Sequence, residues 1–409
     1  MIMKKVVLAY SGGLDSSVII KWLTLKGCKV IAFLADVGQG EDLKKAQKKA
    51  LKVGAVKACI ADLRKEFVED FIFEAIKANA VYEGRYLLGT SLARPLIAKK
   101  QIEIARAEKT KFVAHGATGK GNDQVRFELA YLTLMPDVTI VSPWKDPEFL
   151  AQFQGRGDMM AFAKKHGIPV SATKKSPYSC DANIMHISYE SGILEDITRT
   201  LPEKEYRMTV SPKRAPEKET VLEISFKSGV PVAVKNISKG RKITGPLKLY
   251  SYLNDVAGAN GVGRIDIVES RFVGMKSRGV YETPAGTVLM AAHRDLETLT
   301  MDREVMKIRD GLIPKFSELV YNGFWLSPEM NMLRKMNDEA QKHVTGKVKL
   351  SLYKGNCVVL GRSSPFSLYD EKSASMDEHG GYDQTDAKGF IKLNALRLKA
   401  SVERAKKHD

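Results

Sequence analysis

The sequence predicts an α/β protein in which a doubly wound parallel sheet is followed by a second, α+β domain and a C-terminal helix. Three observations predict this. Strand-like and helix-like segments alternate over residues 5–141. After residue 170, the strand-like segments alternate apolar and polar side chains, as antiparallel strands do. A last helical segment, 390–407, carries a single apolar stripe. A chain of 409 residues is long enough for two or three domains.

Five short apolar runs in the first part have the length of buried strands, and helical patterns separate them. The predicted strands are 5–10, 29–35, 56–60, 111–114 and 138–141. The predicted helices are 15–25, 41–52, 91–109 and 122–134. In the second of these helices the outer face is rich in lysine, namely Lys44, Lys45, Lys48, Lys49 and Lys52. Ligands of parallel sheets bind beyond the carboxyl ends of the strands, so the loops 9–17 and 115–126 are the first candidates for a site.

The pattern changes after residue 169. The predicted strands of the second domain are 220–227, 231–236 and 264–274, and its longer helices are 247–256 and 287–309. Residues 363–389 are rich in Ser, Gly and Asp and predict a loop or linker. We therefore expect domains at 1–168 and 169–375, followed by a linker and terminal helix at 376–409.

The terminal helix places Ile391, Ala395, Leu398 and Val402 on one face. This apolar stripe has to be buried somewhere. It can dock on its own chain or, equally, on a neighbouring one.

Composition excludes several classes of protein. The longest apolar runs, such as 6–10 and 30–35, are far shorter than the ~20 residues that cross a bilayer. The four cysteines are far apart, without a C-x-x-C pair, so neither zinc nor a disulfide framework is indicated. The start of the chain lacks the apolar core of a signal peptide, and we expect a cytoplasmic protein. The net charge of +17 is spread along the chain and favours a solvated basic surface over a nucleic-acid module.

The segment Ser-Gly-Gly-Leu-Asp-Ser-Ser at 11–17 lies between a predicted strand and a predicted helix. Adjacent glycines let the backbone approach a ligand, and the free N–H groups of a helix start favour anions. The lysine that a P-loop requires is missing. Asp15 beside a phosphate needs a cation between them, so we expect it at Mg²⁺. The segment resembles the pyrophosphate-binding loop of the N-type ATP pyrophosphatases, in which ATP is cleaved between its α and β phosphates.

The second candidate loop, 115–126, is dense in glycine and short polar side chains. Thr118, Asn122, Asp123 and Arg126 combine neutral donors, an anion and a cation, a mixture that suits a zwitterion. Arg126 is able to hold a carboxylate through two hydrogen bonds. The alternative is a solvated pair of Asp123 with Arg126 on a helix surface.

Longer motifs resemble the argininosuccinate synthase family from the first strand to the terminal helix. The residues that carry the resemblance are 85–95, 115–126, 178–181 with 186–190, and 263–266 through 281–284. The resemblance implies a ligase that condenses citrulline with aspartate and converts ATP, with Mg²⁺, to AMP and pyrophosphate. It also implies a synthetase role for the second domain and a homotetramer in which the terminal helix reaches a neighbouring subunit. The product would serve arginine biosynthesis or the urea cycle, without nucleic-acid or membrane partners.

The resemblance also assigns residues to three substrates. For ATP it implies Ala9, Tyr10, Ser11, Gly12, Gly13, Leu14, Asp15, Ser16, Ser17, Ala35 and Gly116. For aspartate it implies Thr118, Asn122 and Asp123. For citrulline it implies Tyr86, Ser91, Asn122, Arg126, Ser179, Ser188, Glu269 and Tyr281. Asp15, Asp123 and Arg126 are expected to carry the chemistry. The family often has Thr in place of Ser16, and the hydroxyl is retained.

Two questions stay open on the residues alone. The amine proton of aspartate could pass to Asp123, to His115 or to a phosphate oxygen. A tRNA-thiolation enzyme that adenylates a uridine shares the 11–17 loop and suits the positive charge, but it requires reactive cysteines and a concentrated basic face.

Overall fold

The computed structural model describes residues 4–169, 178–375 and 383–407. Parts of two predicted segments, 170–177 at the domain junction and 376–382 in the linker, lie outside these residues. Residues 367–409 form a unit of their own, and we describe them separately.

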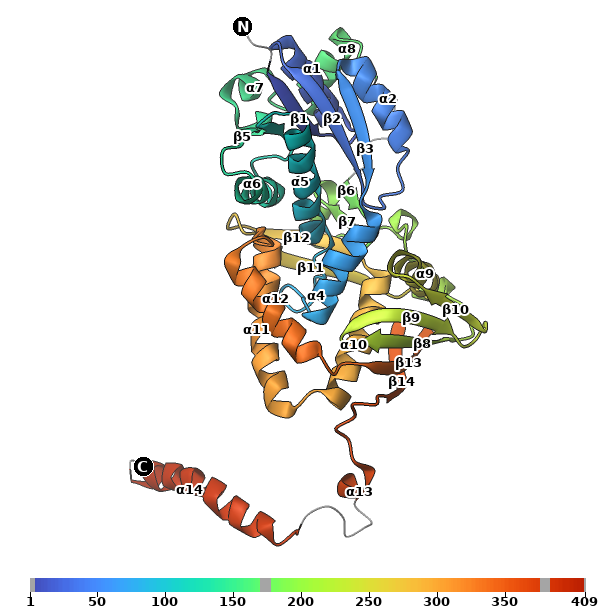
Figure 1. The fold of residues 1–409 in the computed structure, drawn as a ribbon, viewed down its shortest axis with the longest axis vertical. Helices are drawn as coiled ribbons and strands as arrows, with labels where there is room; N and C mark the ends of the chain where they lie inside the picture. Colours follow the sequence, from blue (N-terminus) through green and yellow to red (C-terminus); the bar gives the residue numbers. More distant parts are fainter. Residues whose placement is uncertain (1–3, 170–177, 376–382, 408–409) are drawn as a thin grey trace. The chain divides into compact units, whose positions relative to one another are not determined.

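The N-terminal part contains a parallel sheet of five strands (Figure 1). Its strands are β1 (Lys5–Ala9), β2 (Lys29–Asp36), β3 (Lys57–Asp62), β4 (Phe112–Ala114) and β5 (Thr139–Val141). Their spatial order is β3-β2-β1-β4-β5, and every neighbouring pair is parallel. The prediction of a parallel sheet is thereby confirmed.

Helices cover both faces of this sheet. On one face lie α1 (Leu14–Leu25), α2 (Leu43–Val53), α7 (Pro147–Gln152) and α8 (Arg156–Lys165). On the other lie α5 (Gly89–Ala107) and α6 (Asp123–Leu134). The side chains of β1 alternate between the two cores, because Val6 and Leu8 pack under the first set and Val7 under the second. The continuous apolar run at 6–8 therefore reflects a strand buried on both faces.

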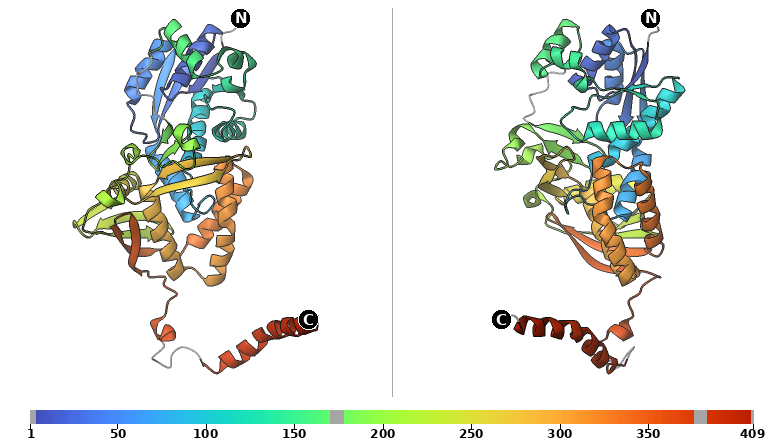
Figure 2. Two further views of the ribbon diagram at one scale, coloured as in Figure 1. Left: turned by 180° about the vertical axis from the view of Figure 1, so that it is seen from behind. Right: turned by 90° about the vertical axis from the view of Figure 1, so that its left-hand side faces the viewer.

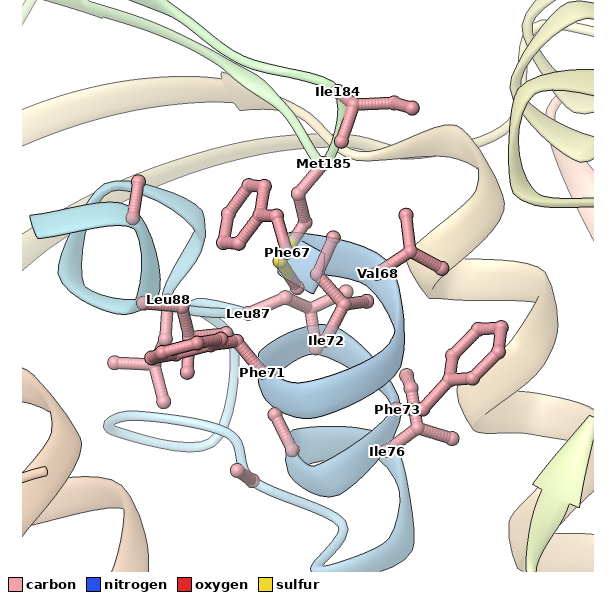
Figure 3. Close-up of a cluster of buried hydrophobic side chains, with 14 of the residues drawn as sticks. Phe67, Val68, Phe71, Ile72, Phe73, Ile76, Leu87, Leu88, Ile184 and Met185 are labelled. Carbon is pink, nitrogen blue, oxygen red and sulfur yellow. The ribbon is translucent and has the colours of Figure 1, made fainter. Parts of the chain in front are cut away.

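A helical segment between β3 and α5 has no counterpart in the prediction. It consists of α3 (Arg64–Glu66), a π-helical turn Phe67–Ile72 and α4 (Phe73–Lys77). Figure 3 shows the apolar side chains of this segment meeting Leu87, Leu88 and Met185. Its apolar side chains belong to the same core as those of the second part of the chain, so residues from before 168 help to build that core.

Two antiparallel sheets make up the second part, which confirms an α+β composition. One has the order β10-β9-β8-β13-β14 and the other β11-β12-β7-β6. The strands are β6 (Ser179–Ala182), β7 (Ile187–Glu190), β8 (Thr220–Lys227), β9 (Val230–Asn236), β10 (Arg241–Thr244), β11 (Arg264–Ser270), β12 (Lys276–Glu282), β13 (Gly346–Tyr353) and β14 (Asn356–Ser363). The helices are α9 (Pro246–Ala259), α10 (Pro284–Thr300), α11 (Arg303–Asn322) and α12 (Pro328–Gln341). Figure 2 shows α11 and α12 beside each other from two further directions.

Two predicted elements are wrong in extent. The helix expected at 287–309 is broken, because Asp302 leaves the helical conformation and its side chain caps the start of α11 by accepting from the N–H groups of Glu304 and Val305. The strand expected at 264–274 ends at Ser270. A tight turn reverses the chain into β12, closed by hydrogen bonds from the Arg271 N–H to the Met275 carbonyl and from the Gly274 N–H to the Arg271 carbonyl.

The C-terminal unit contains α13 (Glu371–Ala374) and α14 (Asp386–Lys406). The segment predicted as loop up to residue 389 therefore includes a short helix and the start of α14. No side chain of α14 in the described part is buried, and Phe390 is 69% exposed. Among the described residues, none of the helices has the length and apolar character needed to traverse a lipid bilayer.

Candidate active site

The 9–17 loop lies at the carboxyl end of β1, the central strand, and leads into α1. Gly12 has φ of 81°, and a Cβ there would lie only 3.0 Å from the Cβ of Ala46, so the tight turn requires glycine. Hydroxyl groups brace the loop from within, since Ser11 Oγ lies 3.1 Å from Ser16 Oγ and Ser17 Oγ donates to the Gly13 carbonyl at 2.6 Å. The first N–H groups of α1 have no partner within the helix and are available for an anion.

A lysine from the next helix also fixes this loop. Lys49 Nζ donates to the Gly12 carbonyl at 2.8 Å. The placement of Lys49 on the outer face of its helix is therefore wrong, because its side chain reaches back to the loop. Burial lowers the pKa of its ammonium group. A lysine that is distant in sequence therefore lies beside the loop, on α2.

Asp15 lies in the first turn of α1, partly buried. Burial raises the pKa of its carboxyl group, and the charge of Arg156 opposes that shift. Ala35 is the penultimate residue of β2, and Gly116 lies two residues after β4. Because β2 and β4 are the two neighbours of β1, the residues predicted for ATP share one edge of the sheet. A Cβ on Gly116 would lie 3.2 Å from Ile19 Cδ1, which keeps this position small.

The start of α6 carries the predicted aspartate and citrulline residues Asn122, Asp123 and Arg126. Both oxygens of the Asp123 carboxylate are held by arginines: Oδ1 accepts from Arg126 Nη1 at 2.8 Å, and Oδ2 from Arg94 Nε at 2.9 Å. Arg94 also donates to Asp181 in β6 at 2.7 Å and so connects α5 and α6 to the second part of the chain. The alternative of a solvated Asp123–Arg126 pair does not hold, because the pair belongs to a partly buried network.

The two arginines determine the ionisation of Asp123. Burial raises the pKa of its carboxyl group, but the attraction of Arg94 and Arg126 outweighs this and brings the pKa to about 2. A carboxylate with so low a pKa is a weak base. Asp123 is therefore better suited to bind an ammonium group than to accept a proton during the reaction.

This low pKa predicts a specific pH dependence. A carboxyl group whose pKa falls on folding, here from 3.8 to about 2, stabilises the folded state above the higher value and loses that contribution as the pH falls toward the lower one. We expect the difference in unfolding free energy between wild type and Asp123→Asn to be constant above about pH 4 and to shrink below it. Denaturant titrations at several pH values measure it, and a difference that does not change down to pH 2 would contradict the ion network.

Four further predicted citrulline residues, Ser179, Ser188, Glu269 and Tyr281, lie on one face of the β11-β12-β7-β6 sheet. Tyr281 is in register with Ser188, and Ser188 with Asp181. Ser179 lies two residues before Asp181 in β6, and Glu269 lies four residues after Ile265, the partner of Tyr281 in β11. Side chains alternate between the faces of a sheet along each strand, so both residues share this face. Ser188 and Tyr281 are buried, whereas Ser179 is exposed.

Glu269 is held by two phenols. Its carboxylate accepts from Tyr281 at 3.0 Å and from Tyr321 at 2.7 Å. Burial raises the pKa of the Glu269 carboxyl group, and the two phenol donors and Arg126 reduce that shift.

Tyr86 contacts this sheet face from the N-terminal part, and Ser91 lies in the first turn of α5. The ring of Tyr86 stacks on Tyr281 with their centres 4.3 Å apart, and its hydroxyl accepts from the N–H of Thr90 at 3.3 Å. Ser91 Oγ is buried without a hydrogen-bond partner among the described residues. A buried polar atom of this kind suits a site that a polar ligand completes.

Thr118 and His115 differ from the residues above. Thr118 is exposed on the loop before α6. His115 is buried, with Nε2 2.8 Å from Glu128 and its ring stacked on Phe127. These contacts occupy its ring, which favours a structural role over proton transfer.

The residue-by-residue prediction missed several side chains that contact the predicted site. Lys49 contacts Gly12, Arg94 contacts Asp123, and Tyr321 contacts Arg126 and Glu269. Asp181 is connected to the site through Arg94. Arg94 and Asp181 belong to motifs on which the resemblance depends, and that was the available signal. Tyr321 and Lys49 lie outside every such motif.

Comparison with known proteins covers the chain almost completely. Residues 5–169 match the family model of the arginosuccinate synthase N-terminal HUP domain, and residues 178–401 match that of the arginosuccinate synthase C-terminal domain. The chain is 60% identical to the argininosuccinate synthase of Thermotoga maritima over 396 residues, 97% of each chain. It is 58% identical to that of Danio rerio, over 96% of this chain and 95% of the other. It is also 58% identical to that of Rattus norvegicus, over 96% of both.

The residues that match the N-terminal domain include the parallel sheet and the 9–17 loop. Those that match the C-terminal domain include the sheet face with Glu269 and Tyr281. The identity of 58–60% extends over nearly the whole length of this chain and of these relatives. The chain belongs to the argininosuccinate synthase family.

Proposed function

We propose that this protein joins citrulline to aspartate, forming argininosuccinate while ATP is converted to AMP and pyrophosphate. The observation that supports this most is the similarity to argininosuccinate synthases over nearly the entire chain. The division into an ATP-binding domain (1–168), a synthetase domain (169–375) and a terminal segment (376–409) is part of the proposal.

In the first step the ureido oxygen of citrulline attacks the α-phosphorus of ATP. A P–O bond forms to citrulline, the bond to the β-phosphate oxygen breaks, and pyrophosphate leaves. The N–H groups at the start of α1 and the hydroxyl groups of Ser11 and Ser16 would hold the leaving pyrophosphate. Arg126 and Glu269 would hold citrulline so that its oxygen lies in line with the bond that breaks.

In the second step the amine of aspartate attacks the ureido carbon and AMP leaves with the oxygen. The amine loses a proton in this step, and the low pKa of Asp123 favours a phosphate oxygen of AMP as the acceptor. Thr118, Asn122 and Asp123 would orient the amine. Alignment of two bound reactants is able to contribute about 7–11 kcal/mol to lowering the barrier.

Asp15 is suited to a magnesium ion that enters with ATP. Mg²⁺ is usually bound by one or two carboxylates together with substrate phosphates and water. The Asp15 carboxylate is partly buried beside the hydroxyl-lined loop, where a divalent cation would offset the burial that raises its pKa. The ion would neutralise charge on the departing pyrophosphate.

We expect Asp15→Asn to lower kcat by about tenfold or more, equal to ~1.4 kcal/mol of barrier, because the cation loses its carboxylate ligand. The Mg²⁺ concentration at half-maximal rate should rise, while the KM values of citrulline and aspartate stay near wild type. Initial rates across a Mg²⁺ titration measure this. Asp62→Asn is a matched control, since Asp62 ends β3 at the same sheet edge and is exposed beside Arg64. An Asp15→Asn enzyme with the wild-type Mg²⁺ profile would contradict the role.

We further propose a cytoplasmic homotetramer that serves arginine biosynthesis or the urea cycle. The supporting feature for assembly is α14, whose apolar side chains Phe390, Ile391, Leu393, Leu396, Leu398 and Val402 are exposed. Packing against a neighbouring copy would bury them.

Pyrophosphate release tests the proposed function directly. Purified protein with ATP should release AMP and pyrophosphate only when citrulline is present, and argininosuccinate should form when aspartate is added. Addition of tRNA should change nothing. Release that requires tRNA and ignores citrulline would establish the thiolation alternative, and formation of ADP would refute both.

A further inference from the structure

The buried side chain of Tyr321, near the end of α11, contacts two residues of the proposed citrulline site at once. We propose that Tyr321 is a positioning residue for citrulline, which fixes Arg126 through its backbone carbonyl and Glu269 through its hydroxyl. The inference rests on the proposed function and adds to it a residue from an element that carries none of the predicted site.

The contact with Arg126 uses the backbone and the ring of Tyr321. Arg126 Nε donates to the Tyr321 carbonyl at 2.8 Å, and the guanidinium carbon lies 5.0 Å from the centre of the ring. Gly323 permits this approach: it has φ of 92°, and a Cβ there would lie 2.8 Å from Arg126 Cα. The Nε bond fixes the plane of the guanidinium group and thus the direction of its remaining N–H donors.

The contact with Glu269 uses the phenol. Tyr321 donates to Glu269 Oε1 at 2.7 Å, while Tyr281 donates to Oε2 at 3.0 Å. Glu269 is only 7% exposed, so the two phenols set the orientation of the carboxylate. The lone pairs that they leave free would accept N–H groups of citrulline.

Other aromatic rings hold Tyr321 in place. Tyr82 stacks on it with the centres 3.7 Å apart and the planes within 3°, and Tyr86 meets it edge-on at 6.2 Å. Tyr321 is 1% exposed and has little freedom to turn. Arg126 from α6 and Glu269 from β11 are therefore held in fixed relative positions before citrulline binds. This reduces the loss of side-chain conformational entropy on binding.

The Tyr321 hydroxyl also favours the ionised form of Glu269. Burial raises the pKa of that carboxyl group, and the hydrogen bonds from Tyr321 and Tyr281 lower it. The titratable and charged groups that face Glu269 are Tyr82, Tyr86, Arg126, Glu190, Tyr281 and Tyr321. Removal of one phenol donor should raise the pKa of Glu269 and move the acid limb of kcat/KM for citrulline to higher pH.

The test compares Tyr321→Phe with Tyr189→Phe in the full-length protein. Tyr189 is a buried tyrosine of β7 that donates to a buried carboxylate, Glu282, at 2.5 Å, and its register puts it on the opposite face of the sheet from Ser188. Both variants lose a phenol that bonds a carboxylate, so both should lower thermal stability. Only Tyr321→Phe should raise the KM for citrulline, by roughly tenfold, with kcat and the KM for ATP near wild type.

A second comparison distinguishes action through Glu269 from a general loss of packing. Addition of Tyr321→Phe to Glu269→Gln should raise the KM for citrulline by much less than it does in the wild type, because the shared carboxylate is already gone. Equal effects in both backgrounds, or a Tyr321→Phe enzyme that resembles Tyr189→Phe in KM and acid limb, would overturn the inference. A wild-type protein without citrulline-dependent AMP formation would instead refute the proposed function itself.

Discussion

Arg126→Ala is expected to lower kcat/KM for citrulline by about ten- to a hundredfold. A hydrogen bond to a charged group contributes about 1.5–3 kcal/mol, and the guanidinium is the proposed partner of the citrulline carboxylate. The loss should appear as a higher KM for citrulline, measured by initial rates at saturating ATP and aspartate. Aspartate binding should weaken as well, because Asp123 would lose one of the two arginines that hold its carboxylate and keep Arg94.

Arg126→Lys is the control for geometry. It retains the charge but cannot supply both the Nε bond to Tyr321 and the Nη1 bond to Asp123 in one plane. We therefore expect it to recover part of the lost activity at most. Normal saturation by citrulline in Arg126→Ala would remove this residue from the site.

Glu297→Gln is expected to lower the free energy of unfolding by about 3–5 kcal/mol, as does the loss of one partner from a buried ion pair. Glu297 in α10 is fully buried and accepts from Arg309 Nη2 at 2.5 Å, from Asn79 at 2.7 Å and from Gln341 at 2.7 Å. Burial opposes its ionisation, but His293 and Arg309 outweigh it and lower the pKa of the carboxyl group. Among the described residues, glutamine would leave the buried Arg309 guanidinium with Asp310, which is 34% exposed, as its one charged partner.

Denaturant midpoints measure this loss, and Glu304→Gln is the control. Glu304 is 59% exposed at the start of α11, where it pairs with Lys307 and Arg303. Surface pairs of this kind contribute little, so its midpoint should stay near wild type. Similar midpoints for the two variants would mean that the buried network does not stabilise the fold.

Features carried by contiguous residues were predictable from the sequence. The strands of the parallel sheet follow from buried apolar runs, and the 9–17 loop follows from glycines and hydroxyl residues between a strand and a helix. The second sheet face was predictable only through resemblance. Glu269 sits in an alternating strand like any solvated carboxylate, and its burial depends on Tyr281 and Tyr321 from other elements.

Contacts between distant segments gave no local signal. Arg126 and Tyr321 are separated by 195 residues, and nothing in the composition near Tyr321 indicates that its carbonyl binds an arginine. The contact of Lys49 with Gly12 was unpredictable for the same reason, over a shorter separation in sequence. Lys49 looks like one more surface lysine until the fold brings Gly12, 37 residues earlier, beside its ammonium group. The break at Asp302 had a visible sign, an acidic cap, but apolar periodicity on both sides concealed it.

The helical segment that includes Phe67, Phe71 and Ile76 lies within the first 168 residues, yet its apolar side chains pack into the core of the second part. A fragment that ends near residue 168 would expose these apolar side chains to water. The remaining fragment would have a cavity in its core where they pack. We therefore expect neither fragment to fold on its own. Exchange of one half between relatives is therefore expected to require a complementary change in the other.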